Sequence, residues 1–427
     1  MKTLYLLLLS LSLASPVHAA PELSLGEVTR AVLADNPKIT QARAKWDAMR
    51  ARVPQAAAWA DLRAGADSVL GRFVNISPNS FTDQKLSLEQ EVPISGQNRS
   101  RARIAAAEAL GAFEETRRQE LDVLAQARAA YFRLANGWAQ LELNRQNIVS
   151  LRQIAEISRS KYEVGKQTAA SVLTAETEAG KLEETQRDLE QKIATEQSAL
   201  NVLMNRDAFA PLARPNEIAL PVAAFSPKQL RALTLTHRPE VRAAEAGLAA
   251  DKSRLELAHR AWIPDPAISV QGSRYNDTGQ ALSEVGAGIS FHIPWSNPRK
   301  YSAAVREAQS NLEAARAALD RTQKEATGLV RDALQKVETA QHHVELFRDQ
   351  LVPQARQAFE ANQFSYASGQ AGFLDWISAQ RNLRDLEALA REHVADYEAA
   401  LAELEAVVGA DLKVFSSSAH PMKQSNK

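Results

Sequence analysis

The sequence predicts a mainly helical chain with a small β part, arranged as two similar halves. Glycine and proline, at 17 residues each, make up only about 8% of the 427 residues, against ~12% in an average protein, so we expect long uninterrupted elements. Two stretches of about 65–70 residues keep an apolar three-four spacing, the pattern of long packed helices. Four shorter stretches alternate apolar and polar residues with a period of two, as strands do.

The N-terminus predicts export. Lys2 is followed by an apolar run from Leu4 to Leu13 and a small-residue exit at Ala19, an order typical of a secretory signal peptide. We therefore expect residues 1–19 to be cleaved. About ten apolar residues cannot cross a ~30 Å hydrocarbon core. No later stretch reaches eighteen consecutive apolar residues, so any crossing of a membrane is expected to be by strands.

Composition and motifs exclude several classes of protein. Lys+Arg and Asp+Glu balance at 51 each, which argues against a nucleic-acid partner. With no cysteine, disulfides, thiol nucleophiles, Cys-ligated metals and a Cys lipid anchor are excluded. His342, His343 and His393 are interpreted as surface residues, because neighbouring helical side chains point about 100° apart. Phosphate-loop, nucleophile-elbow and HExxH motifs are absent, so we expect no enzyme, no cofactor and no metal site.

Two halves of the chain align at an offset near 200 residues, which indicates a tandem repeat. We predict a first repeat at 20–207, a linker at 208–224, a second repeat at 225–411 and a tail at 412–427. The aligned pairs are Pro37 with Pro239, Trp59 with Trp262, Pro93 with Pro294, Tyr162 with Tyr366, and Gly165 with Gly369.

A strand pair is predicted in each repeat, at 62–70 and 84–92, and at 267–275 and 282–293. Each strand has one apolar and one polar face, which fits either a soluble hairpin lying on helices or a strand of an outer-membrane barrel. Export favours the barrel. Since the smallest barrels have about eight strands, four cannot close one, and two copies would supply eight strands or three copies twelve.

The long helices are predicted at about 98–164 and about 298–366, the second with an interruption at Pro353. Each would measure about 100 Å at 1.5 Å per residue. Shorter helices, at about 169–205 and 371–409, return antiparallel after glycine turns. The charged faces of these helices are interpreted as solvated. An extended coiled-coil assembly follows.

Taken together, these features resemble the TolC-type outer-membrane efflux proteins. The most specific motif is Tyr, two residues, Gly, five residues, Asp and two hydrophobic residues; it reads Tyr366, Gly369, Asp375-Trp376-Ile377 in the second repeat. In the first repeat, after Tyr162 and Gly165, Ser171 replaces the acid. The strand exit at 92–103 is similar to that of the heavy-metal branch, the CzcC-like and CusC-like proteins.

The resemblance implies a homotrimer in the outer membrane, with a trimeric α-barrel tunnel of coiled-coil hairpins and a 12-stranded β-barrel to which each chain gives four strands. It implies a periplasmic membrane-fusion adaptor and an inner-membrane RND-type pump as partners, outer-membrane lipid around the barrel, and heavy-metal cations as the cargo. Drug efflux and type I protein secretion are the alternative uses of such a duct. A periplasmic coiled-coil adaptor that never spans the membrane is the alternative of another class.

Site residues also follow from the resemblance. Asp375 would line the tunnel constriction as a ring of three carboxylates, which attracts cations, and Ser378 stands where many members have a second acid. Tyr366 would face Ser171. Tyr162, Gly165 and Gly369 would belong to the turns that meet the adaptor. Simpler roles are a helix-dipole charge for Asp375, packing for the tyrosines and a positive φ for the glycines.

Overall fold

A computed structural model describes residues 22–69, 83–216, 225–277 and 280–412. The predicted signal peptide, part of the predicted linker and nearly all of the predicted tail lie outside the described residues. The chain forms two compact units. Unit 1 combines residues 1–34, 126–221 and 340–399, and unit 2 combines 35–125, 222–339 and 400–427. These units cut across the two predicted repeats, and the repeat assignment stays a prediction about sequence.

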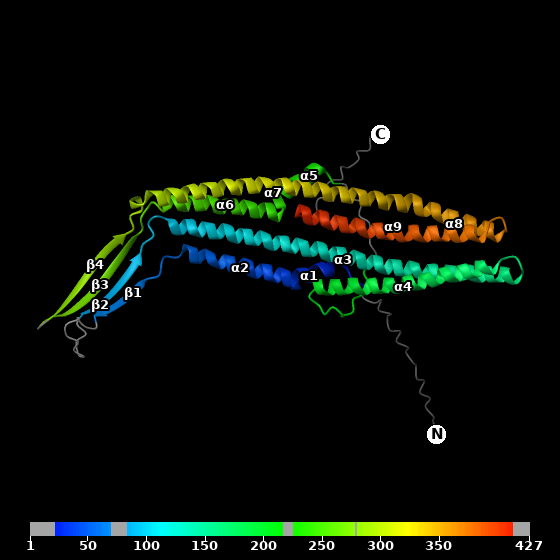
Figure 1. Cartoon of the computed structure of the whole chain (residues 1–427), viewed down its shortest axis with the longest axis horizontal. Helices are drawn as coiled ribbons and strands as arrows, with labels where there is room; N and C mark the ends of the chain where they lie inside the picture. The colour runs from blue at the N-terminus through cyan, green and yellow to red at the C-terminus, as the bar shows by residue number, and fades with distance from the viewer. Residues whose placement is uncertain (1–21, 70–82, 217–224, 278–279, 413–427) are drawn as a thin grey trace, which may run out of the picture. The chain divides into compact units, whose positions relative to one another are not determined.

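Unit 2 holds a four-stranded antiparallel sheet in the order β1-β2-β3-β4 (Figure 1). The strands are β1 (Arg63–Val69), β2 (Asp83–Glu91), β3 (Pro266–Asp277) and β4 (Gln280–Phe291). All four predicted strands form. The end predicted at residue 293 is wrong, because the chain leaves the sheet after Phe291 and Pro294 opens a short 3-10 turn, η1 (Pro294–Ser296).

The sheet has one apolar and one polar face, as the period of two predicts. Leu88 pairs with Val270 and Ile268 with Ile289 on one face, and these side chains are exposed. Arg63 pairs with Glu89 on the other face, where their charged groups lie 3.5 Å apart. Other exposed apolar residues of these strands are Leu86, Val285 and Phe291.

The helices of unit 2 are α2 (Pro37–Ala57), α5 (Pro227–His237) and α6 (Pro239–Arg260), and those of unit 1 include α1 (Leu25–Asp35), α4 (Ala169–Leu203) and α8 (Val352–Ala367). Three more helices contribute residues to both units: α3 (Gln97–Glu163), α7 (Pro298–Leu346) and α9 (Phe373–Val408). The predicted 67-residue helix therefore forms without a break. The mainly helical fold with a small antiparallel sheet is confirmed.

The second long helix is interrupted, as Pro353 predicts. Residues Phe347–Leu351 form a π-helical turn, η2, between α7 and α8. Proline has no N–H and its ring clashes with the carbonyl four residues earlier, at Asp349. A wider turn relieves this clash while the chain continues in the same direction.

Unit 1 packs two helical hairpins on one another. The first hairpin is the end of α3 joined to α4 through a turn at Gly165, and the second is α8 joined to the beginning of α9 through a turn at Gly369. Their shared core contains Leu151 and Ala175 from the first hairpin and Tyr366, Trp376 and Ile377 from the second. In the described ranges, no helix is both long and apolar enough to cross a membrane.

Candidate functional site

Both hairpin turns end their first helix in the same way. Gly165 and Gly369 have φ of 70° and 80°, and each N–H donates to the carbonyl of the tyrosine three residues earlier, Tyr162 or Tyr366. The next N–H donates five residues back. This is the Schellman arrangement, in which a glycine with positive φ ends a helix. The Tyr-x-x-Gly spacing therefore has a local structural cause in both copies.

The two tyrosines nevertheless lie in different surroundings. Tyr162 is 50% exposed, whereas Tyr366 is only 4% exposed. The Tyr366 ring stacks on Trp376 with centroids 4.8 Å apart. Lys161 Nζ lies over the same ring, 3.8 Å from its centroid, and donates to the Tyr366 carbonyl at 2.8 Å. Tyr366 thus contacts a buried aromatic residue of its own hairpin and a cation of the other hairpin.

The structure does not show a hydrogen bond between Tyr366 and Ser171. The buried Ser171 hydroxyl accepts from Gln167 Nε2 at 2.7 Å and lies 3.3 Å from the Thr168 hydroxyl. Within the described part of the chain, the Tyr366 hydroxyl has no hydrogen-bond partner. The contact between the two hairpins at this level is instead made by Lys161.

Asp375 lies in the first turn of α9 with its side chain exposed. Its Oδ2 accepts from the Gly372 N–H at 3.1 Å, the reach-back contact of a capping box. Ser378 is exposed one turn further along the helix. The capping role is therefore present within a single chain, and the exposed carboxylate remains available to other groups.

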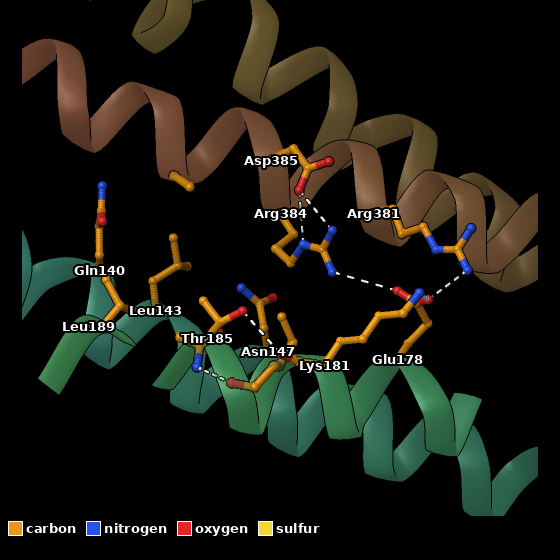
Figure 2. A pocket seen from close by; sticks show the side chains of 13 residues that line it. Gln140, Leu143, Asn147, Glu178, Lys181, Thr185, Leu189, Arg381, Arg384 and Asp385 are labelled. Carbon is orange, nitrogen blue, oxygen red and sulfur yellow. Dashed lines mark hydrogen bonds and ion pairs between the residues drawn. The ribbon is translucent and has the colours of Figure 1, made fainter. Parts of the chain in front are cut away.

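A buried carboxylate joins the two hairpins two turns beyond Ser171. Glu178 on α4 has a side chain only 5% exposed. Lys181 from its own helix lies 2.8 Å away, while Arg381 and Arg384 of α9 lie 2.9 and 3.8 Å away. Figure 2 shows both arginines reaching across from α9 toward this one carboxylate. Three cations thus compensate the charge that Glu178 buries.

The electrostatic balance keeps Glu178 ionised. Burial by itself raises the pKa of its carboxyl, but hydrogen bonds from Lys181 and Arg381 outweigh burial and hold that pKa below its usual value. The prediction that the charged faces of these helices are solvated is wrong at this position. A charged residue on a helix can be buried when a neighbouring helix supplies opposite charges.

Next to this cluster is a cavity of about 560 Å³ (Figure 2). Its lining is mixed, with Leu143, Leu182 and Leu189 beside the charged groups. Asn147 also lines it and accepts from Gln380 Nε2 at 3.2 Å, a further polar contact between the hairpins. The cavity therefore lies between the same two hairpins, lined by residues of α3, α4 and α9.

The histidines are closer than their sequence positions suggest. The rings of His343 on α7 and His393 on α9 lie 4.9 Å apart, and His342 lies 6.3 Å from His343. Across the described ranges, no group of three or more His, Cys, Asp or Glu residues is placed to hold a metal ion.

Sequence reasoning found the turns but missed Lys161, Glu178, Arg381 and Arg384. Each is one charged residue among many on long helices, and nothing in the spacing distinguishes it. The one available signal is an asymmetry between the repeats, because Glu178 and Arg381 align with the uncharged Asn382 and Thr177.

Two curated relatives show the range of similar proteins. The toluene efflux pump outer membrane protein TtgF of Pseudomonas putida is 29% identical over 215 residues, which cover 50% of this chain and 45% of TtgF. The nickel and cobalt resistance protein CnrC of Cupriavidus metallidurans is 24% identical over 325 residues, covering 76% and 75% of the two chains. This chain thus spans about half the length of TtgF.

Solved structures share the fold over nearly the whole chain. CusC superposes with a TM-score of 0.77 at 15% identity, covering 92% of this chain and 93% of CusC. VceC of Vibrio cholerae superposes with a TM-score of 0.74 at 19% identity, covering 90% and 96%. The sequence also matches the outer membrane efflux protein family over residues 28–206 and 230–410. Because these two segments make up most of the chain, the protein belongs to the outer membrane efflux protein family and is a protein of the outer membrane.

Proposed function

We propose that this chain is the outer-membrane duct of a tripartite efflux system, in which three copies form one channel. The channel conducts its cargo passively from a periplasmic adaptor and an inner-membrane RND-type pump to the exterior. Each copy adds four strands to a twelve-stranded barrel and four long helical segments to a tunnel. Heavy-metal cations are the proposed cargo.

The observation that carries this proposal is the sheet of unit 2. Its apolar face is exposed, with Val285 at 86% and Ile289 at 70%, while its other face carries charged and small polar residues. The end strands β1 and β4 each pair with one neighbour among the described residues. An exposed apolar face suits lipid, a polar face suits an aqueous bore, and two free edges are satisfied when copies pair edge to edge.

The hairpin turns of unit 1 supply the proposed periplasmic end. Exposed apolar side chains at both turns offer a surface for the adaptor: Tyr162, Val164, Leu173, Phe364 and Leu374. With Gly165 and Gly369 at their apices, the turns are compact and well defined. In the trimer, the three Asp375 carboxylates form a ring at the constriction, a cation-attracting arrangement in a narrow bore.

The metal cargo is supported by the likeness to CnrC, whose name refers to nickel and cobalt, and by the cation-attracting ring. TtgF, whose name refers to toluene, shares a higher identity over a shorter stretch. Solvent or drug efflux is therefore the second candidate. Since a passive duct receives its cargo from the pump, the two cargoes must be separated by experiment.

The test is deletion of the gene followed by growth on transition-metal salts, organic solvents, dyes and antibiotics, with a restored wild-type copy as the control. Sensitivity to one or two metals, reversed by complementation, is expected. Sensitivity to solvents or antibiotics alone would instead support solvent or drug efflux, the second candidate. In parallel, the purified protein is expected to migrate as a trimer in mild detergent and to conduct ions in planar bilayers. Recovery of the protein as a soluble periplasmic monomer would contradict the proposal that it is an outer-membrane channel.

A further inference from the structure

A smaller cavity, of about 290 Å³, lies in unit 1 beside the cavity at Glu178. Leu143 of α3 lines both cavities. The smaller one lies between a face of α3, residues of α9 and residues 214–216, which belong to the predicted linker. Since a water molecule occupies about 30 Å³, this volume holds about ten water-sized groups. The cavity therefore has the size of a site for a small organic molecule.

The linker segment that forms one wall of this cavity is fixed by backbone hydrogen bonds. The Leu23 N–H donates to the Arg214 carbonyl at 2.9 Å, and the Asn216 N–H donates to the Leu23 carbonyl at 3.2 Å. The Tyr131 hydroxyl on α3 donates to the same Leu23 carbonyl at 3.0 Å. Residues 214–216 are therefore attached to α3 through Leu23, and the Arg214 side chain extends from a fixed position.

Two buried polar atoms in the lining have no hydrogen-bond partner among the described residues. They are Asn136 Oδ1, which is an acceptor, and Trp138 Nε1, which is a donor. Asn136 is only 5% exposed. Nearly all buried polar groups in folded proteins are hydrogen-bonded, because an unpaired one costs free energy. A ligand that both donates and accepts hydrogen bonds would satisfy the two atoms together.

Two arginines bring positive charge to the same cavity. Arg214 Cζ lies 5.6 Å from the centroid of the Trp138 ring, a cation–π contact that needs none of its N–H donors. Arg391 reaches the cavity from α9. Within the described ranges, neither arginine forms an ion pair with a carboxylate. Glu142 adds one negative charge to the lining, so the two arginines leave it net positive.

We propose that this cavity binds a small organic anion that also carries a hydroxyl group. The anionic group, a carboxylate or a phosphate, binds Arg214 and Arg391, because the planar N–H fork of a guanidinium matches the oxygens of such groups. The hydroxyl donates to Asn136 Oδ1, and an oxygen of the ligand accepts from Trp138 Nε1. This inference goes beyond the proposed function, since the site lies within one chain and requires neither a trimer nor conduction.

The test is calorimetric titration of the purified full-length protein, in mild detergent, with tartrate and with glycerol 3-phosphate. Saturable binding of one anion per chain is expected, and the tighter binder identifies the anionic group as carboxylate or phosphate. The neutral counterparts threitol and glycerol should bind at least about tenfold more weakly, as should succinate and propyl phosphate, which lack the hydroxyls. Absence of saturable binding by both anions, or equal binding of the neutral counterparts, overturns the proposal.

Substitutions then place the binding in this cavity. Arg214→Gln and Arg391→Gln are each expected to weaken binding about tenfold, since each removes a charge-assisted hydrogen bond. Arg145→Gln is the matched control, because Arg145 is an exposed residue of α3 outside the lining. If Arg145→Gln weakens binding as much as the two lining variants do, the anion does not bind in this cavity.

A further variant tests the hydroxyl contact and separates it from damage to the fold. Asn136→Leu keeps a side chain of similar size but removes the acceptor. It should weaken binding of the hydroxylated anion while leaving that of its counterpart without hydroxyls unchanged. A general loss of structure would weaken both. Equal weakening of the two anions, or no weakening of either, would contradict the role of Asn136.

Discussion

Glu178 lies at the centre of a charged contact between the two hairpins. Glu178→Gln keeps the shape and removes the charge that Lys181, Arg381 and Arg384 surround. Hydrogen bonds to charged groups contribute about 1.5–3 kcal/mol, and the cations are partly exposed, so we expect a loss near the lower end of this range. Denaturant unfolding of the purified protein measures it. Asp385→Asn is the control, because the Asp385 side chain is 62% exposed and should cost far less.

The contribution of Glu178 to stability is expected to depend on pH. The pKa of Glu178 is lowered in the folded chain, so its stabilising contribution is complete above the usual glutamate pKa of about 4.3. It is lost as the pH falls through the lowered value, because protonation removes the charge in the folded state too. The stability difference between wild type and Glu178→Gln should therefore be constant from pH 7 to about 5 and shrink in stronger acid. A difference that stays constant to pH 3 would contradict the assignment.

The cation preference of the proposed channel is expected to depend on Asp375. If three Asp375 carboxylates line the constriction, Asp375→Asn removes the charge of the ring while retaining an oxygen that can accept from the Gly372 N–H. Preference for cations, read from the reversal potential in a salt gradient, should fall, and block by multivalent cations should weaken. Unchanged selectivity would leave Asp375 with its capping role alone.

At the scale of elements, the turns at Gly165 and Gly369 depend on the backbone conformation of a single residue each. Gly165→Ala or Gly369→Ala places a side chain at a positive φ, which costs about 1–2 kcal/mol. Gly180 lies within α4 with open space around its Cα, so Gly180→Ala should stabilise by about 0.5–1 kcal/mol. Hydrogen exchange at the Lys166 and Gln370 amides, which close the two turns, should speed up in the turn variants and remain slow in the control.

Local rules explain which elements could be predicted. The alternation of the strands, the unbroken 67-residue helix, the interruption at Pro353 and the glycine turns all follow from a residue's own backbone preferences. The ion pairs of Glu178 with Arg381 and Arg384 could not be predicted, because they depend on which helix lies beside α4. For the same reason, the contact of Lys161 with Tyr366 could not be predicted, because the position of Lys161 on α3 gives no sign of its target.

On the scale of the whole molecule, family membership decides whether the chain belongs to an enzyme class. The chain belongs to a family of efflux proteins, and the prediction that it is not an enzyme is confirmed by that membership. A duct needs walls, a gate and a part that sits in the membrane. These depend on the faces of sheets and on the contacts between helices. The apolar face of the sheet, the hairpin turns and the contacts between the hairpins therefore account for the features that stand out in this sequence.

If the sheet forms part of the proposed barrel, its insertion into the outer membrane depends on which face of the sheet meets lipid. Val285 lies mid-way along β4 on the exposed apolar face, and Gln271 lies on the polar face of the adjacent strand, paired with Gly286. Arginine facing lipid near the bilayer midplane costs about 2–4 kcal/mol, whereas a residue facing the bore only alters selectivity. Val285→Arg should therefore sharply reduce the heat-modifiable trimer in the outer-membrane fraction, while Gln271→Arg should insert normally and shift conduction toward anions. Equal insertion of both variants would mean that the apolar face of the sheet does not face lipid.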